Sequence, residues 1–188
     1  MSAGHPAIPA SVFLGHAFLV ATAVMYGVYW VLQYYGKFTI VQLFLLIASI
    51  SIGFVGLFLF YTSSAALLMP ARTQNAPILL GGTALFVLSV ILMQVIFKRP
   101  FTSEIFFAFL WAVSEMNILY SIHSTGRVGK APFAVMAACV LLCTAVNLVC
   151  YRIHFELTEY GRFVNGLVPY CVSAFFMTAI LIILLLNG

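Results

Sequence analysis

One carboxylate, Glu115, lies deep inside a largely apolar stretch of the sequence that runs from 101 to 123. A charged side chain at the centre of a bilayer costs roughly 2.5–3.5 kcal/mol on insertion scales, so an ionisable group there is a candidate for binding a proton or a ligand. The same carboxylate can instead join two helices by hydrogen bonding, at roughly 0.6 kcal/mol per bond. A role in helix packing is the simpler interpretation of Glu115. The sequence leaves open whether it also binds a proton or a ligand.

Five other side chains are candidates to share a site with Glu115. His16 lies near the start of the first apolar run, the hydroxyl residues Tyr61, Thr62 and Ser63 lie at the end of the second, and His123 ends the run that carries Glu115. If the runs are helices that cross back and forth, all of these positions fall in the same half of the bundle. A carboxylate paired with a histidine or a hydroxyl could bind a proton or a small ligand.

The helical period also predicts which residues share a face with Glu115. Trp111, Ile118 and Ile122 stand four residues before, three after and seven after it, so they project from the same side of a helix. Asn117 projects from roughly the opposite side. We therefore expect Glu115 and Asn117 to serve separate sites.

The elements that must position these residues are membrane-spanning helices. The sequence is 64% hydrophobic and 6% charged, far from the roughly 25% charged residues of soluble domains. A span needs about 20 apolar residues, and the apolar runs here are continuous rather than alternating, which favours helices over a barrel. We expect an all-α, polytopic membrane bundle of about six helices with short loops in a single integral membrane domain, 1–188. The predicted helices are 11–35, 40–62, 77–97, 101–123, 131–151 and 163–187.

Charge and motifs exclude several function classes. The eight Lys and Arg residues are scattered among loops, which is not the clustered footprint of a nucleic-acid-binding protein. The sequence has no catalytic Ser-His-Asp order, HExxH motif, phosphate-binding loop or dinucleotide-binding fingerprint. These absences favour a protein that is not an enzyme, and we expect neither a cofactor nor a metal site. The segment 151–162 alternates apolar and charged residues, which is typical of a turn at the membrane interface.

Short motifs spread along most of the chain form a pattern. They are Gly15-His16, Tyr29-Trp30, Glu115 with His123 and Gly126-Arg127, and Glu159-Tyr-Gly-Arg162 before the last run. This pattern is similar to the transmembrane-protein-45-like family (domain of unknown function 716). The resemblance implies a helical membrane architecture with a possible His/Glu site, adds His123 and Arg127 as companions of Glu115, and marks Arg127, Glu159 and Arg162 as interface candidates. The chain departs from the family in three places: it lacks a histidine pair in 131–151, has Gly166-Leu-Val-Pro-Tyr170 in place of a Gln-Gly-Thr-Trp stretch, and shows six runs instead of seven.

Three functions remain open at this point. The leading hypothesis is a multi-pass, non-catalytic structural or accessory component, packed in the bilayer with other membrane subunits or with itself. The first alternative is a small, proton-coupled transporter centred on Glu115. The second is an intramembrane lipid-modifying enzyme that uses His16 and Glu115, which requires the two side chains to lie within hydrogen-bond reach.

Overall fold

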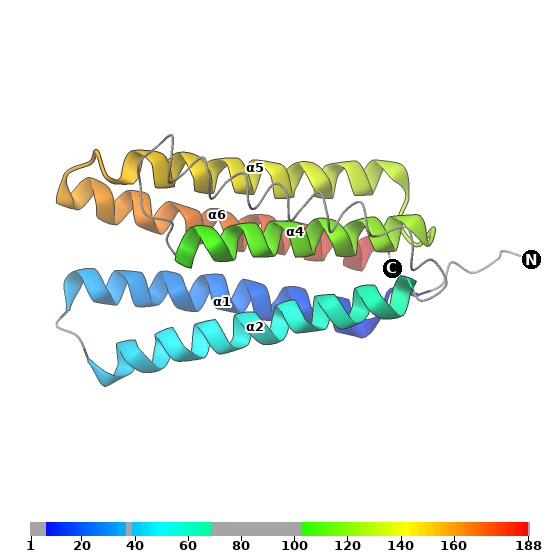
Figure 1. Cartoon of the computed structure of the whole chain (residues 1–188), viewed down its shortest axis with the longest axis horizontal. Helices are drawn as coiled ribbons and strands as arrows, with labels where there is room; N and C mark the ends of the chain where they lie inside the picture. The colour runs from blue at the N-terminus through cyan, green and yellow to red at the C-terminus, as the bar shows by residue number, and fades with distance from the viewer. Residues whose placement is uncertain (1–6, 37–38, 69–102, 188) are drawn as a thin grey trace, which may run out of the picture.

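The computed structural model describes residues 7–36, 39–68 and 103–187, and in these ranges the chain forms five long α-helices (Figure 1). The helices are α1 (Ala10–Tyr35), α2 (Ile40–Leu68), α4 (Ser103–Ser124), α5 (Lys130–His154) and α6 (Glu159–Asn187). The chain is thus an all-α bundle, as the continuous apolar runs predicted.

The described helices form a closed ring. α1 packs on α2, α2 on α4, α4 on α5, α5 on α6, and α6 returns to α1. Helices joined by a short turn run antiparallel to each other (Figure 1). The start of α1 and the end of α6 lie at the same end of the molecule (Figure 1). We call this the terminal end, and we call the end with the α1–α2 and α5–α6 turns the opposite end.

The described helices overlap the predicted ranges but differ from them at several ends. α1 begins one residue before the predicted 11, α2 extends past the predicted 62 to Leu68, and α6 begins at Glu159 instead of 163 and is helical through Pro169. α1, α2, α5 and α6 are long and apolar enough to cross a membrane, whereas α4 is not among these four. The predicted helix at 77–97 lies outside the described residues, so the count of about six is not confirmed.

Apolar side chains fill the centre of the terminal half of the bundle and also cover its outer surface. In the terminal half, large side chains that are essentially inaccessible fill the centre of the ring, and they come from all five helices: Val12, Phe60, Ile118, Ile122, Met136, Ile180 and Leu184. Outside the ring, bulky apolar side chains such as Phe44, Phe58 and Phe175 are more than 60% exposed. Helices that carry apolar side chains on all sides are typical of membrane spans.

Candidate functional site

The structure joins the two sequence candidates His16 and Glu115 directly. Nε2 of His16 lies 2.8 Å from Oε1 of Glu115, and both side chains are 0% exposed. Nδ1 of the same histidine lies 2.8 Å from the backbone carbonyl of Val12, one turn earlier in α1. The ring of Phe60 from α2 packs against the imidazole at 4.6 Å between centroids. The pair therefore bridges α1 and α4, which are not neighbours in the ring.

The hydrogen bonds of His16 restrict where the protons of the pair lie. The Val12 carbonyl can only accept, so Nδ1 must carry a hydrogen. Nε2 then either accepts the hydrogen of a neutral Glu115 or donates its own to an ionised one. In both arrangements one proton lies between Nε2 and Oε1, and the pair has no net charge. A neutral pair avoids most of the cost of burying an isolated charge.

The local sequence of α4 explains why Glu115 points inward. On α4, Trp111, Glu115, Ile118 and Ile122 are all at most 5% exposed, which confirms the predicted shared face. Glu115 therefore has no route to the lipid. Its second oxygen, Oε2, is buried and has no hydrogen-bond partner among the described residues.

Tyr61 and Thr62 do not join this pair. Tyr61 is 72% exposed, and the hydroxyl of Thr62 donates to the carbonyls of Phe58 and Leu59 in its own helix. Both lie in the predicted half of the bundle, but successive residues of a helix point in directions about 100° apart. The inward positions on α2 are Phe60, against His16, and Ser63. Ser63 is buried as a member of the predicted cluster would be, but its hydroxyl lies 2.7 Å from that of Ser11.

His123 and Arg127 lie at the terminal end, beyond the reach of the pair. The ring of His123 stacks on Phe133 at 4.7 Å, and its Nδ1 donates to the carbonyl of Val128 at 2.9 Å. Nη1 of Arg127 donates to the carbonyl of Ala7 at 2.8 Å. His123 follows Glu115 by more than two helical turns, about 12 Å along the axis. These contacts fix the α4–α5 turn and the segment before α1.

The same turn depends on a left-handed glycine. Gly126 has a φ of 72°, its N–H donates to the carbonyl of His123, and the N–H of Arg127 donates to that of Ile122. This is the Schellman arrangement that ends many helices. A Cβ at Gly126 would meet nothing within 4 Å, so only the backbone conformation opposes a side chain there.

We therefore expect Gly126→Ala to lower the free energy of unfolding by about 1–2 kcal/mol, because an L-residue is disfavoured in this region. Gly126→Asn should cost less, since asparagine tolerates the left-handed conformation. Thermal unfolding in mild detergent would measure both variants. Equal losses in the two would contradict a conformational cause.

Glu159 and Arg162 lie at the opposite end, around the α5–α6 turn. Glu159 is in the first turn of α6, where a negative charge is favourable, and Nε of Arg162 donates to the carbonyl of Leu157 at 2.9 Å. With Trp30, Gln33, Tyr34, His154 and Phe163 they line a hollow of about 280 Å³. They are therefore far from the His16–Glu115 pair, and their role at an interface stays a prediction.

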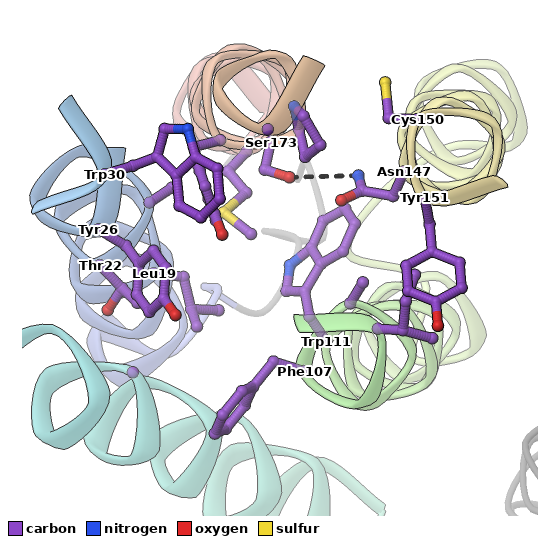
Figure 2. Close-up of a pocket in the computed structure, with 18 of the residues that line it drawn as sticks. Leu19, Thr22, Tyr26, Trp30, Phe107, Trp111, Asn147, Cys150, Tyr151 and Ser173 are labelled. Atoms are coloured by element: carbon purple, nitrogen blue, oxygen red, sulfur yellow. Dashed lines mark hydrogen bonds between the residues drawn. The ribbon is translucent and has the colours of Figure 1, made fainter. Parts of the chain in front are cut away.

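A second hollow lies inside the ring, and the sequence did not predict it. It has a volume of about 380 Å³ and occupies the half of the bundle toward the opposite end, with walls from all five helices (Figure 2). We call it the central cavity. Leu19 and Trp111 line it, and each stands about one helical turn from a member of the His16–Glu115 pair. The pair itself does not line the cavity.

The aromatic residues at the end of the first predicted helix are an ambiguous signal for this cavity. The positions of Tyr26, Tyr29, Trp30, Tyr34 and Tyr35 favour an interfacial belt. Tyr26 and Trp30 instead line the cavity, whereas Tyr35 is 72% exposed. The spacing of Tyr26 and Trp30, one helical turn apart, was the available sign of an inward aromatic face.

Within residues 7–36, 39–68 and 103–187, no three His, Cys, Asp or Glu side chains gather closely enough to hold a metal ion. No family model, curated protein or solved structure matches this chain. The resemblance to the transmembrane-protein-45-like family therefore rests on the short motifs alone and stays a prediction.

Proposed function

We propose that the chain is a six-span integral membrane protein with a non-catalytic, structural role, packed in the bilayer against other membrane subunits or a second copy of itself. The observation that carries the proposal is the isolation of the His16–Glu115 pair. Both side chains are 0% exposed, and neither lines the central cavity or the hollow at Glu159. A catalytic acid or base must reach a substrate. A sealed pair that bridges two helices is suited to holding them together.

The same observation weighs against the two alternatives. The lipid-modifying enzyme needs His16 and Glu115 within hydrogen-bond reach, which they are, but it also needs a substrate site next to them. A proton-coupled carrier needs a path from Glu115 to water. The walls of the nearest cavity are predominantly apolar, and Glu115 is not among them. The geometry therefore favours packing over either chemistry.

The course of the chain supports a sixth span. α2 ends at the terminal end and α4 begins at the opposite end (Figure 1). The intervening sequence contains the apolar run 77–97, which is long enough to cross a bilayer. We therefore place the further span there. The many exposed apolar side chains outside the ring support insertion in a membrane.

Small residues on the outer face of α5 support association with a partner. The small residues Ser49, Gly53 and Gly56 of α2 face the interior of the bundle. There Gly53 lies against Thr22 of α1, and Gly56 lies against Leu19. Ala134 and Ala138 of α5, which have the same spacing of one turn, are exposed instead. Small residues spaced by four allow two membrane helices to approach closely.

We expect Ala138→Leu to dissociate the assembly without unfolding the chain, because the added side chain projects outward. Cross-linking in lipid nanodiscs followed by mass measurement would test this. The cross-linked wild type should be heavier than the 20.6 kDa chain, whereas the variant should have the mass of the chain alone. Cys171→Leu is the matched control, since Cys171 is also exposed but lies on α6 beside the bulky Phe175. It should leave the assembly intact. A wild-type protein that is a monodisperse monomer with no co-purifying partner in mild detergent would contradict the proposal.

A further inference from the structure

The indole of Trp111 presents an unsatisfied donor on the wall of the central cavity. Its side chain is 5% exposed, and its Nε1 is buried without a hydrogen-bond partner among the described residues. An indole N–H can only donate, and leaving it unpaired in an apolar interior is unfavourable. The other tryptophan, Trp30, also lines the cavity, but its Nε1 donates to the carbonyl of Phe163 at 3.0 Å. Trp111 therefore lacks an acceptor that Trp30 has.

Two other polar side chains lie near Trp111 on the cavity wall. Asn147 of α5 and Ser173 of α6 face the cavity from the neighbouring helices, as Figure 2 shows. Nδ2 of Asn147 donates to the carbonyl of Cys143 at 2.8 Å and lies 3.5 Å from Oγ of Ser173. The amide and the hydroxyl thus satisfy each other in part, whereas the indole N–H does not share in these bonds. Asn147 and Ser173 form a small polar spot on the wall, and the unpaired indole N–H of Trp111 is a separate donor.

The remaining lining restricts the charge and shape of a possible ligand. No Asp, Glu, Lys or Arg is among the described residues that line the cavity. The only histidine among them is His154, so a charged molecule would meet no permanently charged side chain, which is unfavourable in an apolar environment. Aromatic rings form one side of the wall, where Tyr26 lies 4.8 Å and Trp30 6.4 Å from Tyr170 between ring centroids. Small-molecule sites typically occupy about 300–1,000 Å³, and the cavity, at about 380 Å³, falls in this range.

We propose that the central cavity binds a neutral, mainly apolar molecule whose oxygen, such as a carbonyl, accepts a hydrogen bond from the indole N–H of Trp111. The apolar body of this molecule lies along the aromatic wall. Its oxygen lies at the indole N–H of Trp111, which stands one helical turn before Glu115 in α4. The site is separate from the structural role of the His16–Glu115 pair, because neither member of that pair lines the cavity.

The test compares two radiolabelled probes that differ in one oxygen: a straight-chain methyl ketone of about twelve carbons and the alkane of the same length, sizes suited to a small-molecule cavity. Each is equilibrated with the full-length protein in nanodiscs, and retention by empty nanodiscs is subtracted. We expect the protein to bind the ketone about three- to tenfold more tightly than the alkane, which corresponds to one net hydrogen bond. Trp111→Phe should abolish this preference while retaining alkane binding, since the ring stays and only the donor is removed.

Two further variants separate the hydrogen bond from the cavity itself. Trp30→Phe removes an N–H that is already satisfied within the protein, so it should change the retention of both probes in the same proportion. Ala108→Phe places a large ring on the cavity wall and should reduce the retention of both probes strongly. The proposal is overturned if the wild type binds ketone and alkane equally or retains neither. It also fails if the preference survives Trp111→Phe, or if a third probe, the straight-chain carboxylate of the same length, binds more tightly than the ketone.

Discussion

His16→Leu should lower the free energy of unfolding of the bundle by about 3 kcal/mol. The substitution keeps an apolar side chain of moderate size in the core but leaves Glu115 without its hydrogen-bond partner. Oε2 of Glu115 has no partner among the described residues, so both carboxyl oxygens would then be buried and unpaired. Denaturation by titrating an anionic detergent into mild-detergent micelles would measure the loss.

Two companion variants test whether the pair acts by packing. Glu115→Gln should cost less than about 1 kcal/mol, because a glutamine amide can donate to Nε2 of His16 while Nδ1 keeps its bond to Val12. The double variant His16→Leu with Glu115→Leu should be closer to wild type than His16→Leu alone, since no polar group is left unpaired. A Glu115→Gln variant as unstable as His16→Leu would show that the carboxyl group is specifically required. Proton-dependent uptake that Glu115→Gln abolishes in a stable bundle would favour the carrier instead.

The sequence predicted the parts of this fold that follow from composition and helical period. Continuous apolar runs indicated the five described helices, although α2 and α6 extend beyond the predicted ranges at one end. The spacing of Trp111, Glu115 and Ile118 predicted the buried face of α4, because residues three and four apart project from the same side of a helix. Counting crossings placed His16 in the same half of the bundle as Glu115, but it placed Tyr61 and Thr62 there equally and did not single out the contact.

The rest required the rotation of each helix about its own axis, which composition does not determine. α2 is apolar on nearly all sides, so hydropathy did not distinguish the inward Phe60 from the outward Tyr61 next to it. The one available sign was that Phe60 continues, at helical spacing, the face of the small residues Ser49, Gly53 and Gly56. In a lipid environment an outward aromatic side chain carries no penalty, and the usual contrast between polar and apolar faces is lost. The central cavity escaped prediction for the same reason. Tyr26 and Trp30 fit an interfacial belt as well as they fit a cavity wall.

The close approach of α1 and α2 leaves no room for a side chain at Gly15. A Cβ built on Gly15 would lie 2.7 and 2.8 Å from two ring carbons of Phe60 and 3.3 Å from the carbonyl of Gly56. Phe60 is 1% exposed and packs against His16, so its ring has little free space into which to move. We therefore expect Gly15→Ala to lower the free energy of unfolding by about 1–3 kcal/mol, the usual cost of overpacking. Detergent unfolding would measure it alongside the variants of His16.

Gly27→Ala provides the control in the same helix. A Cβ at Gly27 would lie 3.5 Å from Cβ of Tyr170, an ordinary contact, and alanine is favoured over glycine within a helix by roughly 0.5–1 kcal/mol. Gly27→Ala should therefore leave the bundle as stable as wild type or slightly more so. Because Phe60 also contacts His16, the losses from Gly15→Ala and His16→Leu should be smaller together than their sum. Strict additivity would show that the α1–α2 contact and the His16–Glu115 bond stabilise the bundle independently, and would contradict a role of Phe60 as the link between them.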